Sequence, residues 1–387
     1  MTPLLFFKYV PALAGATGEG HAWSTLRHLI LPIGLSFYTF MALGYLIDVY
    51  TDKAPAERDA LRFGAFLSFF PQLTAGPIER AGRFLPQLSR LGTFDPIMAV
   101  SGLRAILLGA FMKIAIADTL APHVNAVYAF PQNHSAFDLA LGTVYFSFQV
   151  YGDFAGYSLM AIGSARLLGI ELMKNFEQPY LSQTLPEYWR RWHISLSSWF
   201  RDYVFIPLQF HIRRSGRRGL ALALISTFTL VGIWHGAGPK YALFGLIHGV
   251  LVAYSTLTIA KRDKLWQRTN LPNWLCHTFR STITFLVISL TFVLFRASGI
   301  ANAMIIYGKL LTADSLARTL PITIPSLAIL LLIGGDLAVS RGMTWERLYR
   351  PLRWLVYYGM IGCVCWLQLK RALGDNNYEP GFIYFGF

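Results

Sequence analysis

The chain has 387 residues, of which 34 are Lys or Arg and 20 are Asp or Glu, so only 14% carry a charge. An ordinary soluble domain has about 25% charged residues. Hydrophobic residues make up 54% of the chain, and its mean hydropathy is +0.44. This composition excludes a soluble globule, which needs charge on its surface, and intrinsic disorder, which requires low hydrophobicity. We therefore predict a polytopic membrane protein.

The charge is strongly unequal, with a net value of +14. On a soluble protein this excess would indicate nucleic acid as a partner. Between apolar segments it instead indicates cytoplasmic loops beside anionic lipid head groups, so we expect the lipid bilayer and no nucleic acid. The three cysteines, Cys276, Cys363 and Cys365, form neither a disulfide framework nor a metal-binding pattern, and we predict no metal site.

Apolar runs of about 18 residues or more can cross a bilayer as helices. In chain order the candidates are 29–49, 97–120, 137–168, 220–235, 241–260, 281–295, 322–339 and 354–369. Four shorter runs predict partial or re-entrant helices: 4–13, 63–73, 199–210 and 301–311. We predict one all-α membrane domain over 1–387, with about 8 to 11 membrane-embedded helices.

Two basic clusters fix the orientation of one helix pair. The cluster at 211–218 precedes the run at 220–235, and the cluster at 261–268 follows the run at 241–260. The positive-inside rule places both clusters in the cytoplasm, so the two runs form a hairpin with its tip at 234–238. From 220 to 234 the helix rises roughly 22 Å, which places the tip deep in the membrane or toward its outer half.

The hairpin tip, Trp234-His-Gly-Ala-Gly238, carries the first candidate site residue. Gly236 and Gly238 permit a break in the helix with positive φ. A histidine in lipid is costly and is by default a functional hypothesis, and its pKa near neutrality suits a general base. The alternative for His235 is a capping histidine packed between helices.

The segment 187–203 is predicted to be one interfacial helix. At helical spacing its tryptophans form a single stripe, which is typical of a helix at the level of the lipid head groups. Arg191 belongs to a second, polar stripe, and His193 and Ser197 lie between the two stripes. This interpretation leaves His193 unexplained, and the alternative is that it faces the same cavity as His235.

Three further features have polar groups at membrane depth. Asp153 requires a partner, such as an arginine, or water, and the pattern leaves a structural ion pair and catalysis open. The prolines and glycine within 69–80 predict a re-entrant turn that lines a pocket. His248 is predicted to be packed in the interior of the returning helix.

Several motifs occur together and in order: LPIGLSFYTF at 31–40, FFPQLTAGPI at 69–78, GDFAGYS at 152–158, NF and PY at 175–180, RWHISLSSW at 191–199, WHGAG at 234–238 and FIYFGF at 382–387. In this combination the chain resembles the membrane-bound O-acyltransferase family. More narrowly, it is similar to the bacterial branch of alginate O-acetyltransferases, which is related to the D-alanyl transfer protein of teichoic acid.

This resemblance implies a helical core with a central funnel and a tunnel to the cytoplasm. It implies that His235 and His193 are catalytic, with Asp153, Trp234, Arg191 and Ser197 as supporting residues. The reaction would move an acyl group, most simply acetyl, from a cytoplasmic donor to hydroxyls of an exported polysaccharide such as alginate. Acetyl-CoA is the expected donor, no bound cofactor is expected, and acceptor or transfer proteins outside the bacterial inner membrane are the expected partners.

The chain also departs from the family pattern. Members of this branch usually begin with further apolar helices, so we expect this chain to lack two or three of them. D-alanyl or peptidoglycan O-acyl transfer is the nearest alternative function. A transporter using Asp153 and broken helices is an alternative of a different class, but no repeated halves are visible in the sequence. A non-catalytic scaffold for a polysaccharide synthase is the third alternative.

Overall fold

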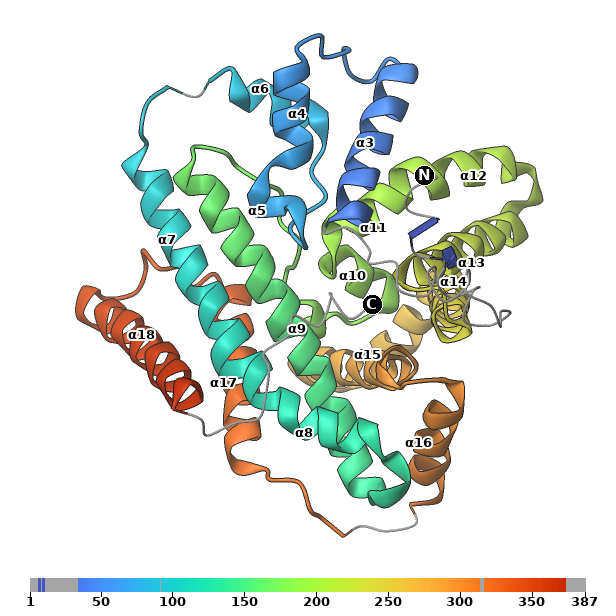
Figure 1. Cartoon of the computed structure of the whole chain (residues 1–387). Helices are drawn as coiled ribbons and strands as arrows, with labels where there is room; N and C mark the ends of the chain where they lie inside the picture. The colour runs from blue at the N-terminus through green and yellow to red at the C-terminus, as the bar shows by residue number, and fades with distance from the viewer. Residues whose placement is uncertain (1–5, 8, 11–33, 91, 314–316, 374–387) are drawn as a thin grey trace, which may run out of the picture.

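The computed structural model describes residues 6–7, 9–10, 34–90, 92–313 and 317–373 (Figure 1). Within these ranges the regular structure is entirely helical, which confirms the all-α prediction. Of the described helices, six are long and apolar enough to cross a membrane: Pro96–Ala129, Arg213–His235, Pro239–Gln267, Asn273–Arg296, Thr323–Ser340 and Arg350–Ala372. These six correspond to six of the eight predicted runs. The first three residues of the motif at 31–40, the motif at 382–387 and most of the run at 4–13 lie outside the described residues.

The two remaining runs are also helical. They form α3 (Leu35–Tyr50) and α9 (Ala136–Leu167). The first candidate span consists of α7 (Pro96–Phe111), a π-helical turn η1 (Met112–Ala117) and α8 (Asp118–Ala129). The later ones are α13 (Gly216–His235), α14 (Pro239–Gln267), α15 (Asn273–Arg296), α17 (Thr323–Ser340) and α18 (Arg350–Ala372).

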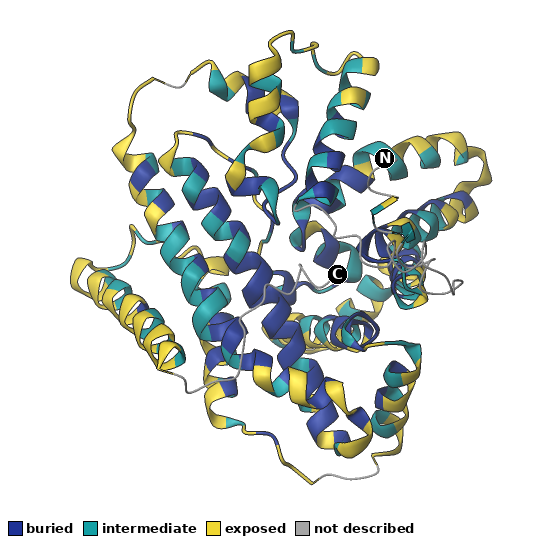
Figure 2. Ribbon diagram, in the orientation of Figure 1, coloured by how far each residue is buried: buried dark blue, intermediate teal, exposed yellow. Residues whose placement is uncertain are grey.

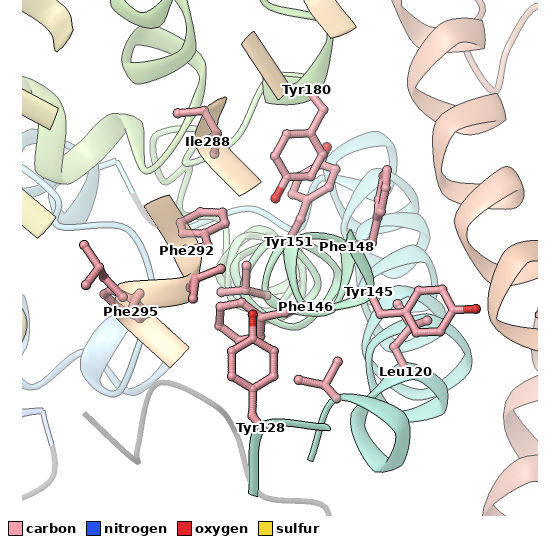
Figure 3. Close-up of a cluster of buried hydrophobic side chains, with 14 of the residues drawn as sticks. Leu120, Tyr128, Tyr145, Phe146, Phe148, Tyr151, Tyr180, Ile288, Phe292 and Phe295 are labelled. Atoms are coloured by element: carbon pink, nitrogen blue, oxygen red, sulfur yellow. The ribbon is translucent and has the colours of Figure 1, made fainter. Parts of the chain in front are cut away.

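The centre of the molecule is α9, which has 32 residues. Every residue from 145 to 156 is buried, whereas α18 at the edge of the molecule is mostly exposed (Figure 2). Aromatic side chains of α9 pack with Tyr180 and Phe292 in the core (Figure 3). Glycines bring α7 against α9, because a Cβ on Gly109 would lie 2.4 Å from the carbonyl oxygen of Gly156. Such close backbone contact is typical of helix packing in membranes.

The predicted re-entrant turn is present. α4 (Ala60–Ser68) and α5 (Phe70–Leu73) are followed by an irregular stretch, after which α6 (Ala81–Leu88) begins. Residues 75–79 of that stretch are buried. The carboxylate of Glu79 accepts N–H bonds from Arg80 and Met173, at 2.9 and 2.7 Å. The turn is therefore held in protein, as a re-entrant segment would require.

The basic clusters predict the side on which each helix end lies. By the positive-inside rule, the arginines before and at the start of α13 and the basic end of α14 are expected in the cytoplasm. The hairpin tip would then point outward. Lys240 at the tip binds the carbonyl oxygen of Ala297, at the end of α15, with a distance of 2.6 Å, so this end of α15 lies on the same side as the tip.

The outer end of α15 fixes the sides of the central helices in turn. Arg296 donates to Asn125 of α8 at 2.6 Å, so α8 ends and α9 begins on the outer side. Near the start of α9, Asp138 accepts the N–H of Thr319 at 3.1 Å, just before α17 begins. α17 therefore runs from the outer side inward, and the loop at 341–349 lies on the cytoplasmic side.

Candidate active site

The hairpin tip is formed as predicted, with His235 as the last residue of α13 and Pro239 as the first of α14. The break is present, but neither glycine uses positive φ: φ is −174° at Gly236 and −76° at Gly238, both extended. The need for glycine at 236 is steric instead. A Cβ there would lie 2.2 Å from the ring of Tyr241.

The two helices of the hairpin touch along their backbones. A Cβ on Gly232 would lie 2.2 Å from the carbonyl oxygen of Tyr241, and one on Gly245 would lie 2.3 Å from that of Phe228. This contact fixes the end of α13, where His235 is 7% exposed. The edge of the Phe295 ring of α15 packs against the imidazole, with 5.1 Å between ring centroids.

The second histidine lies at a break that the sequence pattern did not predict. α10 (Leu185–Arg191) ends before Trp192, and α11 (Ile194–Phe200) begins after His193. His193 is in the left-handed region, with φ 44° and ψ 54°, which is uncommon for a residue other than glycine and often marks a functional site.

The prediction of one interfacial helix over 187–203 is therefore wrong. Its tryptophans are buried in the protein, where Trp199 donates to the carbonyl oxygen of Phe40 at 2.9 Å and Trp189 donates to His248 at 3.2 Å. Helical periodicity correctly grouped the aromatic side chains, but their partners are core residues. Buried indole N–H groups need such acceptors, and lipid head groups are not required to explain them.

Asn175 holds the break in place. Its main-chain oxygen accepts the N–H of Ile194 at 2.9 Å, and its side-chain oxygen accepts the N–H of Ser195 at 3.3 Å and its hydroxyl at 2.9 Å. The same oxygen lies 3.0 Å from Nδ1 of His193. The loop that carries Asn175 is tied to the re-entrant turn, since Glu79 accepts the N–H of Met173. A buried loop asparagine thus positions the second histidine.

These bonds define the tautomer of His193. A main-chain N–H can only donate, so the side-chain atom of Asn175 that meets Ser195 is the oxygen, and Nδ1 of His193 must carry the proton. Nε2 is then the nitrogen with the lone pair. His193 is 1% exposed, and this burial lowers the pKa of its imidazole, which favours the neutral form.

The structure brings both His193 and His235 into contact with one indole, that of Trp234. The ring of Trp234 lies 4.7 Å from that of His235 and 6.3 Å from that of His193, measured between centroids. Phe154 of α9 packs edge-on against His193 at 4.7 Å. Aromatic rings thus surround both imidazoles, which gives the site a low polarity and fixed geometry.

A cavity of about 360 Å³ lies between the broken segment and the hairpin. Ser197 and Ile194 line it from α11, and Val231 lines it one turn before His235. Arg190 and Arg201 add positive charge to an otherwise largely apolar lining. Ser197 donates its hydroxyl to the carbonyl oxygen of Trp192 at 3.2 Å, so it belongs both to the cavity wall and to the break.

The two charged supporting candidates have other partners. Arg191 forms an ion pair of 2.8 Å with Glu187, one turn away on α10. Asp153 pairs with Lys113 at 2.6 Å, so the charged partner that it requires is a lysine. Lys113 also contacts Asp118 at 2.8 Å. These contacts give both residues a structural role, and among the described residues no three His, Cys, Asp or Glu side chains could hold a metal ion.

His248 is packed within α14, as predicted. Its Nδ1 accepts the N–H of Trp189 at 3.2 Å, and its Nε2 lies 2.9 Å from the hydroxyl of Thr291. That hydroxyl donates to the carbonyl oxygen of Ile288 at 2.7 Å. The imidazole is thus a satisfied neutral link between α10, α14 and α15.

Comparisons with known proteins identify the family of the chain. Residues 25–297 match the model of the membrane-bound O-acyltransferase family. The chain belongs to this family, and it is a multi-pass membrane protein.

Its relatives include the "Probable alginate O-acetylase AlgI" of Pseudomonas putida, which is 40% identical over 286 residues, 74% of this chain and 56% of the relative. The "Peptidoglycan O-acetyltransferase" of Helicobacter pylori is 32% identical over 77% of this chain and 60% of its own. The "Teichoic acid D-alanyltransferase" of Bacillus subtilis is 29% identical over 70% and 68%. The chain thus spans just over half the length of the alginate O-acetylases that it matches.

Proposed function

We propose that this protein is an O-acyltransferase of the bacterial inner membrane that moves an acetyl group from a cytoplasmic donor to hydroxyls of an exported polysaccharide. The observation that carries the proposal is the contact of both His235 and His193 with the ring of Trp234, at the end of a hairpin that we predict to open toward the cytoplasm. Alginate or a similar polymer is the proposed acceptor, because the alginate O-acetylases share 38–40% identity with the chain.

The chemistry follows from the two imidazoles. His235 accepts the proton of the acceptor hydroxyl while that oxygen attacks the carbonyl carbon of the acyl donor. The carbon–sulfur bond of an acyl thioester then breaks, and the leaving thiolate takes up the proton. His193, held by Asn175 in one tautomer, orients the reacting groups. The acceptor is either the polymer itself or a transfer protein outside the membrane that carries the acyl group onward.

The donor side is supported by the cavity beside the site. Arg190 provides charge for a phosphate group, while Arg201 is already paired with Asp202 at 2.8 Å. The apolar lining near Val231 suits a thioester arm. Acetyl-CoA has both features and is the proposed donor. The protein is expected to need no bound cofactor, since the donor arrives activated.

The test is the ester content of the exported polymer in cells that carry His235→Ala. Removing a general base costs about 10² to 10⁴ in rate, so we expect the acetyl ester to fall at least 100-fold with the protein level unchanged. His277→Ala, an exposed histidine at the start of α15, is the matched control and should leave acetylation intact. Normal acetylation in His235→Ala would refute the proposal, and mass spectrometry of the ester would reveal D-alanine if the acyl group were different.

A further inference from the structure

A second cavity lies at the cytoplasmic end of α17, far along the chain from the histidines. Its volume is about 490 Å³, and its lining combines two arginines with apolar side chains: Leu337, Ala338, Arg341, Met343, Arg347 and Leu348. Nothing in the proposed acyl transfer uses this cleft. Its combination of paired cations and aliphatic walls is typical of a site for an anionic amphiphile.

The cleft is a folded feature of the loop. Gly342, with φ 78°, ends α17, and the N–H groups of Gly342 and Met343 bind the carbonyl oxygens of Val339 and Ala338 at 2.9 and 3.0 Å. Arg347 returns to donate one N–H to the carbonyl oxygen of Gly342 at 2.6 Å. This bond uses one of its five N–H groups and brings its guanidinium to the end of α17, which also carries Arg341.

The charge of the loop is strongly positive. Residues 341–353 contain four arginines and one acidic residue, Glu346. Glu346 is paired with Arg104 of α7 at 2.5 Å, so its carboxylate is directed to another helix. The end of α17 contributes a partial negative charge of roughly one half, which the two guanidinium groups of the cleft exceed.

The position of the cleft indicates where its ligand comes from. The helices on either side of the loop, α17 and α18, expose large apolar side chains such as Leu330, Leu337, Leu355 and Ile361, as lipid-facing helices do. Trp354, which is 54% exposed, lies at the start of α18, where membrane helices have their interfacial aromatic residues. The loop itself is on the cytoplasmic side, so the cleft lies at the head-group level of the inner leaflet.

We propose that this cleft binds the phosphate head group of an anionic phospholipid of the cytoplasmic leaflet. Arg341 and Arg347 hold the phosphate, and Leu337 and Met343 contact the first part of an acyl chain. The occupant is a lipid because the walls of the cleft are aliphatic and continue onto helices that face the bilayer.

The test is native mass spectrometry of the full chain from mixed micelles of phosphatidylglycerol and phosphatidylcholine. Each arginine near an anionic surface contributes about a fivefold preference, so the double variant Arg341→Gln/Arg347→Gln should lose roughly tenfold or more of the preference for phosphatidylglycerol. The matched control is Arg213→Gln/Arg214→Gln, two exposed arginines of the other cytoplasmic cluster. It should lose clearly less of the preference, and Arg341→Lys/Arg347→Lys, in which the charge is retained, should keep it.

Three results would overturn the proposal. The first is an unmodified chain without any preference for phosphatidylglycerol. The second is an equal loss in the Arg213 and Arg341 double variants, which would mean that only the general surface charge attracts the lipid. The third is displacement of the lipid by millimolar inorganic phosphate, which would identify a site for the free ion. Thermal unfolding of each variant in detergent shows that a lost preference does not come from a lost fold.

Discussion

The two histidines reach the site by different kinds of structure. His235 is delivered by a hairpin of two regular helices, whose contacts lie close together in the sequence, from Phe228 to Gly245. His193 is delivered by a helix that breaks, and the bonds that hold the break come from Asn175, 18 residues before the histidine. The half of the site that carries His235 is therefore stabilised by contacts within the hairpin, whereas the half that carries His193 depends on a separate loop.

This difference has a mechanical consequence. The hairpin tolerates little change, because the backbones of α13 and α14 are in direct contact. In the broken segment, the left-handed backbone conformation of His193 costs about 1 to 3 kcal/mol of conformational free energy. It persists only because the surrounding residues hold it. A perturbation of the hairpin should therefore damage the fold, and a perturbation around Asn175 should damage the site first.

The largest effect is expected for Gly232→Ala. Its new Cβ would meet the carbonyl oxygen of Tyr241 at 2.2 Å, and backbone atoms cannot move aside as a side chain can. The helices must separate, which we expect to destabilise the protein by about 3 kcal/mol and to displace His235. Thermal unfolding in detergent and the ester content of the polymer measure the two effects.

The matched control is Gly238→Ala in the same hairpin tip. The nearest atom to a Cβ at this position is 3.8 Å away, in ordinary contact, and the backbone is extended. We expect stability and acetylation to stay close to those of the unmodified protein. An equal loss in both variants would show that the tip needs glycine for flexibility, and the steric argument for α13 and α14 would be wrong.

A smaller effect, confined to the site, is expected for Asn175→Ala. The variant removes the acceptor of three bonds, from His193 and from the N–H and hydroxyl of Ser195. Leaving these donors without their acceptor costs about 1 to 3 kcal/mol, and we expect acetylation to fall roughly 10- to 100-fold as His193 loses its orientation. The measurement is the same ester assay at matched protein level.

Ser158→Ala is the control, because the hydroxyl of Ser158 accepts the side-chain N–H of Asn175 at 3.0 Å. This variant leaves the side-chain oxygen of Asn175 in place. It should retain most activity. If Asn175 acts through His193, adding Asn175→Ala to His193→Ala should cause little further loss. Full additivity of the two variants would mean that Asn175 supports the fold without positioning the histidine.

The same contrast decides how much could be predicted from the sequence. The hairpin was predicted with its tip, since long apolar runs and flanking arginines are strong signals of helix and side. The re-entrant turn at 69–80 was also predicted, from its prolines and glycine. Both features are encoded in neighbouring residues, which a sequence pattern can detect.

The break at His193 was not predictable in the same way. The residues at 187–203 fit one helix well, and no proline or glycine marks the position where it ends. The break is imposed by Asn175, and nothing in the spacing of the two segments shows that they meet. The motif that contains Asn175 was part of the family resemblance, but only the contacts reveal its task. In the same way, the position of Asp153 within an apolar run required a partner for its carboxylate, but the sequence did not identify Lys113 as that partner.

The smallest effect is expected for Arg191→Met, which tests whether nearness in sequence to His193 implies a role in the site. Arg191 pairs with Glu187 on the same helix, and their side chains are 31% and 21% exposed. Partly exposed pairs of this kind contribute about 0 to 1 kcal/mol, so we expect less than a threefold change in acetylation and a small change in unfolding temperature. The main-chain oxygen of Arg191, which accepts the N–H of Glu177 at 2.9 Å, is unaffected by the substitution. A loss of 100-fold or more with the stability retained would place the guanidinium in the chemistry. The broken segment would then contribute to the site through two side chains, with His193 as only one of them.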